Sequence, residues 1–253
     1  MLFENFIDVC NSNDFCITNL ECPITEASAK IEKTGPHLKS SLNTVEALKF
    51  AGFNIVTLAT NHIMDYGVQG LTQTIEILEN SNIKYVGVGS SLIEARKYLI
   101  LEKEGKKVAI INIAENEFSN TNDNNYGANP LNLALNFEDI QKAKTDSDFV
   151  LIIYHGGNEH FPLPSTRLKE TFRFFINAGA SAVIAHHTHC FSGYEVYRNA
   201  PIFYSLGNFV FDYLNQNNSW QWSTGYAVSL NIENAILKEN ILIIHNEKKK
   251  ISK

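Results

Sequence analysis

The histidines of this chain are clustered, and imidazole is a common catalytic group and metal ligand. Five of the eight fall within 35 residues: His155, His160, His186, His187 and His189. One of them follows the apolar run 149–154 and three follow the run 182–185, and both runs have the composition of buried strands. Because open α/β sheets place their sites beyond the carboxyl ends of the strands, we expect these imidazoles to share one site.

Two earlier predicted strands also end in polar residues. Asn61 and His62 follow one of these strands, and Asn19 and Glu21 follow the other. A single histidine at a strand end is more often a hydrogen-bonded structural residue than a ligand. Four strand ends that all carry such residues are much harder to reach by accident, so the set favours a functional site.

The candidate donors combine a carboxylate, an amide oxygen and several imidazoles. They are Glu21, Asn61, His155, His187 and His189. This mixture suits Mn²⁺, Fe or Zn²⁺ better than Ca²⁺, which prefers oxygen alone, or a thiolate site. The sequence therefore predicts a site for divalent metal ions.

The elements that must position these residues alternate along most of the chain. We expect helices at 44–51, 70–80, 137–143 and 168–178, and strands at 15–20, 54–59, 84–88, 107–113, 149–154, 182–185, 201–205, 226–232 and 236–245. Alternation of this kind favours a mainly parallel sheet covered by helices, and the strand-rich last third adds antiparallel pairs. Residues 1–253 show no linker and no internal repeat, so we expect a single α/β domain with two mixed sheets.

Composition narrows the classes of function. The net charge is −6, from 21 Lys and Arg against 27 Asp and Glu, which argues against a nucleic-acid partner. The chain has no apolar run long enough for a membrane segment, and its first residues do not resemble a signal peptide, so a cytoplasmic location is the default expectation. None of the four cysteines forms a C-x-x-C pair, and we expect all four to be small buried apolar residues.

Five motifs occur in a fixed order between residues 18 and 212. They are Thr18-Asn19-Leu20-Glu21-Cys22-Pro23, Ala59-Thr60-Asn61-His62-Ile63-Met64-Asp65-Tyr66-Gly67, His155-Gly156-Gly157-Asn158-Glu159, His186-His187-Thr188-His189 and Tyr204-Ser205-Leu206-Gly207-Asn208-Phe209-Val210-Phe211-Asp212. Together they resemble the bacterial capsule-synthesis CapA family, which is linked to poly-γ-glutamate capsules and belongs with the calcineurin-like metallophosphoesterases. The resemblance implies a four-layer αββα sandwich of two mixed sheets.

The resemblance also implies roles for particular residues. The metal ligands would be Glu21 as the bridging carboxylate, Asn61, His155, His187 and His189, around two divalent ions. His62 would be the catalytic histidine, Asp65 would orient it, and Glu159 would face the substrate or support the site. Asn19, Asn208 and His186 are further candidates for substrate contact.

One departure from the family pattern concerns the start of the chain. Members usually open with a strand that ends in Gly-Asp, just before the segment that resembles residues 2–4. We therefore expect this domain to lack its first N-terminal strand, so that the first metal keeps only Glu21 and His189 as ligands. If an upstream segment is missing, a membrane-associated or extracytoplasmic location becomes the expectation.

Two functions follow as hypotheses. The first is a metal-dependent hydrolase that cleaves a phosphoester or a capsule-related bond, since two ions ~3.5–4 Å apart activate water and His62 can protonate a leaving oxygen. The second is a non-catalytic component that handles the polymer in a poly-γ-glutamate capsule assembly. The expected partners are a small phosphoester or an anionic polymer and other capsule-synthesis proteins, although the charge of −6 opposes direct capture of a polyanion.

Trp220 and Trp222 have two possible interpretations. Either they form the wall of a site for a polymer, or they lie partly buried against the sheet.

Overall fold

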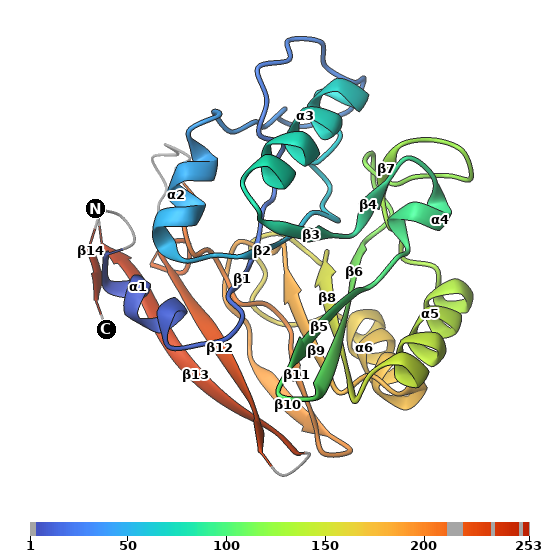
Figure 1. Ribbon diagram of the computed structural model, residues 1–253, viewed down its shortest axis with the longest axis vertical. Coiled ribbons are helices and arrows are strands. Elements are labelled where there is room, and N and C mark those ends of the chain that lie inside the picture. Colours follow the sequence, from blue (N-terminus) through green and yellow to red (C-terminus); the bar gives the residue numbers. More distant parts are fainter. Residues whose placement is uncertain (1–3, 212–219, 234–235, 248–249, 253) are drawn as a thin grey trace.

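Figure 1 shows the computed structural model of the chain, which describes residues 4–211, 220–233, 236–247 and 250–252. The helices are α1 (Glu4–Asn11), α2 (Thr44–Ala51), α3 (Gly67–Asn80), α4 (Leu92–Ala95), α5 (Leu133–Asp146) and α6 (Thr166–Ala178). The strands are β1 (Ile17–Asn19), β2 (Ile55–Thr57), β3 (Lys84–Val86), β4 (Val88–Gly89), β5 (Leu99–Lys103), β6 (Lys106–Ala114), β7 (Gly127–Ala128), β8 (Phe149–His155), β9 (Ala182–His186), β10 (Tyr194–Tyr197), β11 (Ala200–Phe203), β12 (Thr224–Glu233), β13 (Ile236–Glu247) and β14 (Lys250–Ser252).

The largest sheet has six strands in the order β10-β11-β9-β8-β6-β5. Its four central strands run parallel, and the two edge strands pair antiparallel. Strand β8 is buried along its whole length, as its unbroken apolar sequence predicts for a strand covered on both faces. Helices α5 and α6 cover one face, where Phe172 and Phe175 pack against Tyr154 and Val183. The register pairs His155 with His186, so the two histidine-bearing strands end side by side.

A second, three-stranded parallel sheet has the order β1-β2-β3, and the first two candidate motifs follow its strands β1 and β2. Helices α2 and α3 contribute Leu48, Leu71 and Leu78 to the apolar cluster on this side. A smaller cluster joins the two sheets and includes Ile55 from β2 and Ile110 from β6. The protein is thus a mixed α/β structure with parallel and antiparallel pairing, as the sequence indicates. The four-layer arrangement, the absent first strand and the single domain remain predictions.

Helix ends follow the local chemistry of the chain. Helices α2 and α6 end at Gly52 and Gly179, which adopt left-handed φ values of 85° and 115°, as their glycines predict. Helix α5 begins earlier than the expected 137, because the Asn132 side chain accepts a hydrogen bond from Leu135 N at 3.2 Å and caps it. Helix α1 is absent from the predicted elements, since its short apolar pattern did not stand out from the flanking polar residues.

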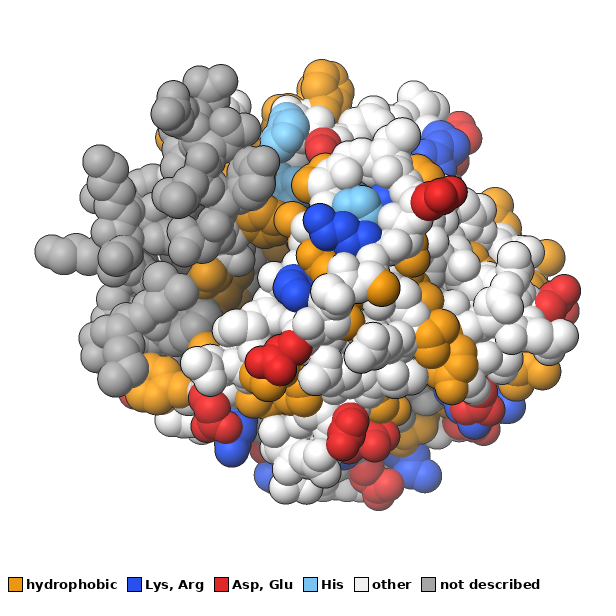
Figure 2. All heavy atoms as spheres, turned by 90° about the horizontal axis from the view of Figure 1, so that it is seen from above, with side chains coloured by type: hydrophobic (Ala, Val, Ile, Leu, Met, Phe, Trp, Pro, Cys, Tyr) orange, Lys and Arg blue, Asp and Glu red, His pale blue; other side chains and the backbone are white. Residues whose placement is uncertain are grey.

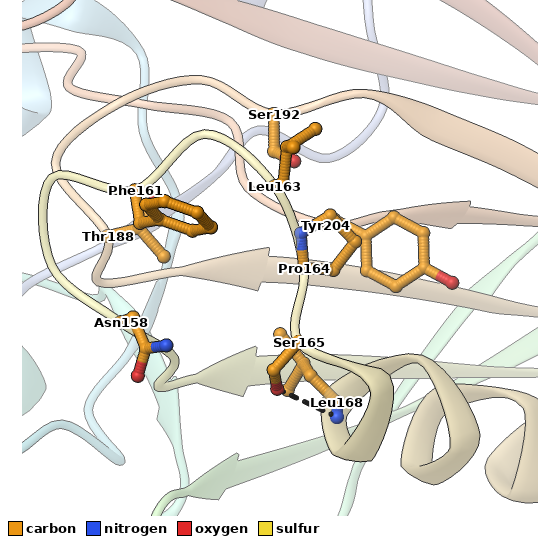
Figure 3. Close-up of a pocket in the computed structure, with 9 residues that line it drawn as sticks. All are labelled: Asn158, Phe161, Leu163, Pro164, Ser165, Leu168, Thr188, Ser192 and Tyr204. Carbon is orange, nitrogen blue, oxygen red and sulfur yellow. Dashed lines mark hydrogen bonds between the residues drawn. The ribbon is translucent and has the colours of Figure 1, made fainter.

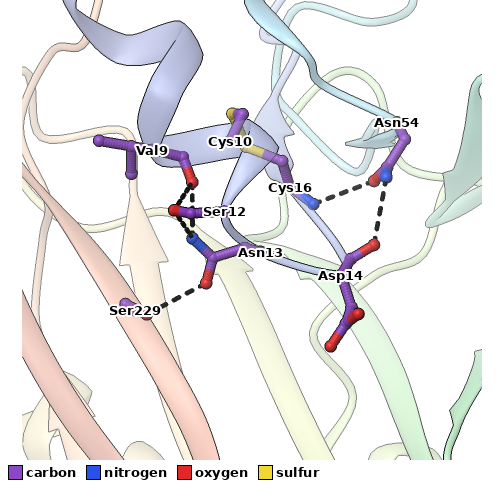
Figure 4. Close-up of a disulfide and its surroundings, with 8 residues drawn as sticks. All are labelled: Val9, Cys10, Ser12, Asn13, Asp14, Cys16, Asn54 and Ser229. Atoms are coloured by element: carbon purple, nitrogen blue, oxygen red, sulfur yellow. Dashed lines mark hydrogen bonds between the residues drawn. A yellow bond between two sulfur atoms is a disulfide. The ribbon is translucent and has the colours of Figure 1, made fainter.

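The expectation of four unpaired cysteines is wrong for two of them. Cys10 at the end of α1 and Cys16 before β1 form a disulfide that closes the turn between these elements (Figure 4). Asn54 supports the same turn, since its side-chain oxygen accepts from Cys16 N at 3.0 Å. Cys22 and Cys190 are free thiols. Cys10 and Cys16 do not have a C-x-x-C spacing, so the sequence carried no local signal for their disulfide.

The last strands form a third sheet in the order β12-β13-β14, with a long antiparallel hairpin between β12 and β13. An isolated bridge between Gly207 and Gly225 connects the last candidate motif to the start of β12. Among the described residues, no helix is both long enough and apolar enough to cross a membrane.

Candidate functional site

The structure brings the five predicted metal ligands together. Glu21 follows β1, Asn61 follows β2, His155 ends β8, and His187 and His189 follow β9. The amide and the three imidazoles are buried, and the Glu21 side chain is 15% exposed. Histidine side chains and a neighbouring acidic side chain are visible on the upper face of the molecule (Figure 2). Strands of two different sheets therefore deliver these donors to one place.

The His155 ring lies between two amide oxygens. Its Nδ1 is 3.2 Å from Asn19 Oδ1, and its Nε2 is 3.0 Å from Asn61 Oδ1. Burial, with a further contribution from neighbouring histidines, lowers the pKa of His155 well below its usual value, so the ring is neutral. A neutral imidazole donates from one nitrogen only. If Nδ1 donates to Asn19, the lone pair of Nε2 faces the oxygen lone pairs of Asn61, and a cation is the natural partner for both.

A second pair of acceptors repeats this arrangement. His189 Nδ1 is 3.0 Å from Asn208 Oδ1, and His189 Nε2 is 3.5 Å from Glu21 Oε1. Burial lowers the pKa of His189 and raises the pKa of Glu21 to about 8, with the carboxylates of Glu159 and Asp65 adding to the rise at Glu21. The Glu21 Oε1 atom has no hydrogen-bond partner among the described residues. The raised pKa means that Glu21 keeps its proton near neutral pH unless a cation is bound, and a bound cation would favour the ionised carboxylate.

His187 lies between the two pairs. Its ring centroid is 5.0 Å from that of His155 and 6.1 Å from that of His189. Its buried Nδ1 has no hydrogen-bond partner within the described part of the chain, and burial lowers its pKa to about 4. His187 and His189 both have positive φ, 98° and 54°, a conformation that non-glycine residues adopt at a cost of about 1–3 kcal/mol. This backbone conformation turns two neighbouring imidazoles toward the centre.

His62 and Asp65 form the dyad that the sequence predicts. His62 Nδ1 is 2.7 Å from Asp65 Oδ2, which leaves Nε2 free for chemistry. The Asp65 carboxylate is fully buried, yet its pKa is lowered, because hydrogen bonds from His62, Lys33 and the Leu38 N–H outweigh the cost of burial. An ionised Asp65 therefore holds the Nδ1–H form of the His62 ring.

The remaining candidates occupy different positions. Asn19 and Asn208 support His155 and His189 through the contacts above, so they lie behind the ligands. Glu159 is half-exposed at the rim, with Oε1 3.9 Å from His187 Nε2. His186 offers its backbone carbonyl, which accepts from Gly156 N at 3.2 Å. Asp212, which ends the last motif, lies outside the described residues.

The candidate ligand atoms are of the types that bind divalent metals, but the structure places them in two close pairs, His155 with Asn61 and His189 with Glu21. Among the described residues, no group of three or more His, Cys, Asp and Glu side chains is arranged to hold one ion. The amide oxygen of Asn61 is the additional donor, and the unpartnered atoms are Glu21 Oε1 and His187 Nδ1. The close pairs His155–Asn61 and His189–Glu21, together with the unpartnered Nδ1 of His187, are the features that a cation would satisfy.

Two pockets are found among the described residues, and one of them lies beside the candidate centre. A pocket of about 10 Å³ is lined by Phe161 and Leu163 of one loop and by Thr188 and Tyr204 (Figure 3). That volume holds about one water molecule. A larger pocket of about 200 Å³ lies between β3, β4 and the end of α4, away from the candidate ligands. Neither pocket is the substrate site that the candidate residues would need.

Two residues of the centre were missed by sequence reasoning. Lys33 reaches the His62–Asp65 dyad from the loop between β1 and α2. Glu117 places its Oε1 3.9 Å from His187 Nε2, at the same distance as Glu159. Both come from polar loops that have no periodicity, so their sequence carried no signal. Trp222 is partly buried and contacts the ring of His189, with centroids 5.0 Å apart, and its role as the wall of a polymer site stays a prediction.

Comparison with known proteins identifies relatives over most of the chain. Residues 1–213 match the family described as bacterial capsule synthesis protein PGA_cap. The chain is 32% identical over 216 residues to PGA biosynthesis protein CapA of Bacillus subtilis (strain 168) and 30% identical over 220 residues to capsule biosynthesis protein CapA of Bacillus anthracis. Each alignment covers 83% of this chain, but only 57% and 54% of the relatives, so the chain spans a little over half their length.

A solved structure supports the fold. A hypothetical protein from Thermus thermophilus superposes with a TM-score of 0.59 at 16% identity, covering 97% of this chain and 93% of that one. At this identity the likeness concerns the fold alone. The family match and the two relatives together show that the chain belongs to the bacterial capsule synthesis protein family PGA_cap, which has a metallophosphoesterase-like fold.

Proposed function

We propose that this chain is a metal-dependent hydrolase that cleaves a phosphoester or a bond in a capsule-related polymer. One observation carries the proposal: His155 Nε2 faces Asn61 Oδ1 at 3.0 Å, and His189 Nε2 faces Glu21 Oε1 at 3.5 Å. When His155 donates from Nδ1 and Glu21 is ionised, each pair places two acceptors face to face inside a buried cluster, and a divalent cation is the simplest species that satisfies both.

The donor types favour Mn²⁺, Fe or Zn²⁺. Asn61, His155 and His187 would hold one ion, His189 would hold another, and Glu21 would be shared between them. Bound divalent ions supply a means to polarise the scissile group and to lower the pKa of water.

The other residues of the centre would supply a proton to the leaving group, hold the histidine rings in place or contact the substrate. Asp65 accepts from His62 Nδ1, so His62 Nε2 points away from the carboxylate and can hold a proton for a leaving oxygen. Asn19 and Asn208 hold the rings of His155 and His189 in place. Glu159 at the rim can accept a hydrogen bond from a substrate hydroxyl or amide.

The first experiment measures turnover of an aryl phosphate and an aryl phosphodiester with Mn²⁺ or Zn²⁺. We expect activity that Glu21→Gln and His155→Ala reduce at least a hundredfold. Glu170→Gln, an exposed change of the same type on α6, is the control and should keep full activity. A protein that binds no divalent metal and turns over neither substrate would contradict the proposal.

A second candidate is a non-catalytic component that handles the polymer during poly-γ-glutamate capsule synthesis. Two observations favour it: the named relatives are biosynthesis proteins, and aromatic side chains such as Phe161 and Trp220 are more than half exposed. Such side chains could contact a polymer or a capsule-synthesis partner. Polymer binding that persists in a His155→Ala/His187→Ala double variant would favour this function, and binding lost together with the metal would favour the hydrolase.

A further inference from the structure

We propose that Lys33 is a positioning residue that fixes the catalytic ring of His62 by holding the Asp65 carboxylate in one orientation. The inference rests on the proposed function of this site, but its test includes a measurement that needs no turnover. Lys33 belongs to none of the motifs that indicate the site, and it is the only lysine described in contact with the His62–Asp65 dyad.

The burial of this lysine is unusual for its type. The Lys33 side chain is 3% exposed and that of Asp65 is fully buried, and the two form an ion pair through Nζ and Oδ1. Lysine is almost never fully buried unless it is paired. Surface ion pairs contribute little, but a buried charge that loses its partner is strongly unfavourable. Lys33 is therefore held at the dyad by the same contact that neutralises Asp65.

The chain around Lys33 is tied to Asp65 on both sides. Ile31 N donates to the Asp65 carbonyl at 3.2 Å, and Leu38 N donates to Asp65 Oδ2 at 2.7 Å. His37 Nε2 lies 2.8 Å from the Ile31 carbonyl and closes the loop between them. The loop 31–38 is thus anchored at both ends on the residue that orients His62, and it carries Lys33 to the other carboxylate oxygen, Oδ1.

The hydrogen-bonding groups leave one consistent arrangement. Lys33 Nζ is 3.0 Å from His62 Nδ1, but a lysine ammonium has only donors, and Nδ1 already lies 2.7 Å from Asp65 Oδ2. If Lys33 donated to Nδ1, that nitrogen would carry no hydrogen, and its 2.7 Å contact with Asp65 Oδ2 would require a proton on Asp65. The pKa of Asp65 is lowered, so Asp65 is ionised and this arrangement is excluded. Lys33 therefore acts on Oδ1 as an ion-pair partner, and Oδ2 is left for the Nδ1–H of His62. Without Lys33, Oδ1 would lose its counter-charge, and the Leu38 N–H would be left to hold the carboxylate, so the His62 ring would be less strictly confined to one tautomer.

The test compares Lys33→Met, which removes the charge at similar length, with Lys33→Arg, which keeps it. Lys30→Met is the control, since Lys30 is exposed on the same loop. Nitrogen-15 NMR of the metal-free protein reports the His62 tautomer directly. We expect the Nδ1–H form in the wild type, Lys30→Met and Lys33→Arg, and a mixture of tautomers in Lys33→Met. An unchanged His62 tautomer in a folded Lys33→Met protein would overturn the proposal.

Turnover supplies a second, independent readout. Lys33→Met should lower kcat about 10–100-fold with KM changed less than about twofold, because supporting contacts of this kind have effects of that size. Adding Lys33→Met to Asp65→Asn should lower kcat no further, since Lys33 acts through Asp65, and this double variant also removes both buried charges should the single variant fail to fold. A further loss in the double variant would overturn the proposal. Complete inactivity of the wild type would refute the hydrolase function, while the tautomer measurement would still decide the role of Lys33.

Discussion

At the residue scale, the candidate centre is defined by side chains that hold other side chains. Asn19 and Asn208 each contact the Nδ1 atom of a histidine whose Nε2 faces the centre. An amide oxygen that accepts from one ring nitrogen fixes the tautomer and leaves the other nitrogen as a ligand. Asn208 is further held by Trp222, whose carbonyl accepts from Asn208 Nδ2 at 3.1 Å.

Asn208→Ala should therefore weaken metal binding without unfolding the protein. The expected loss in Mn²⁺ affinity is about 10–100-fold, because the His189 ring loses the group that orients it. Calorimetric titration of the metal-free variant measures this loss. Asn80→Ala, an exposed asparagine at the end of α3, is the matched control and should bind like the wild type. Equal affinity in the two variants would mean that Asn208 does not orient a ligand.

The sequence was most informative about residues at strand ends. Glu21, Asn61, His155, His187 and His189 are recognisable because each follows an apolar run, and the structure gathers all five. Lys33 and Glu117 could not be found in this way, since they lie in loops whose path depends on contacts with distant residues. The same limit applies to Cys10 and Cys16, because pairing depends on how α1 lies against β1.

At the element scale, the strength of the apolar pattern decided what could be predicted. Strands β8 and β9 and helix α6 have continuous or periodic apolar residues, and they were predicted close to their observed bounds. Glycine fixed the ends of α2 and α6. Helix α1 has only eight residues, too few for its apolar pattern to stand out, and the early start of α5 depends on a capping asparagine, which produces no periodicity.

Strand β10 is joined to helix α6 by an ion pair that gives a pH-dependent prediction. Hydrogen bonds from Arg173, at 2.6 and 2.9 Å, and one from Tyr204 at 2.7 Å outweigh burial and lower the pKa of Glu195 to about 2. Because the folded pKa lies below the unfolded value of 4.5, the stabilisation is complete above about pH 4.5 and is lost as the pH falls toward 2.

Glu195→Gln should remove this acid-dependent contribution. The free energy of unfolding should fall by about 1–2 kcal/mol at pH 6 and by much less at pH 2.5, allowing for partial exposure of the pair. Urea denaturation at the two pH values measures the difference. A loss of equal size at both would show that the ion pair does not act through the charge of Glu195.

The end of helix α2 gives a second prediction about an element. Gly52 has φ 85°, and a Cβ there would lie 2.8 Å from Cys10 Cβ, so Gly52→Ala meets both backbone strain and the disulfide turn. We expect a loss of about 2–4 kcal/mol in unfolding free energy. Gly105→Ala is the control, because Gly105 has φ 72° but open space around it, and should lose only about 1–2 kcal/mol. Equal losses would mean that the α2–Cys10 contact yields easily.

At the scale of the whole molecule, the centre lies where two sheets meet. Neither sheet holds the full set of donors, since Glu21 and Asn61 follow strands of one and His155 and His187 follow strands of the other. Metal binding should therefore hold the sheets together. The net charge of −6 does not attract an anionic substrate, so any attraction must come from the centre itself.

A bound metal should stabilise the fold as a whole. Mn²⁺ at one hundred times its dissociation constant should add about 2.7 kcal/mol to the free energy of unfolding. For a chain of 253 residues this raises the melting temperature by roughly 5–10 °C. Thermal denaturation followed by circular dichroism, with and without a chelator, measures the shift. Identical melting temperatures under the two conditions would argue against a metal that joins the sheets.

Calorimetric titration of Mn²⁺ into the metal-free protein tests the central claim most directly, with Glu21→Gln and His155→Ala beside the wild type. We expect at least one saturable site in the wild type, and affinity lowered at least tenfold in each variant while Glu170→Gln binds normally. Absence of binding by the folded wild type, or equal binding by all four proteins, would contradict a metal centre built from these strand ends.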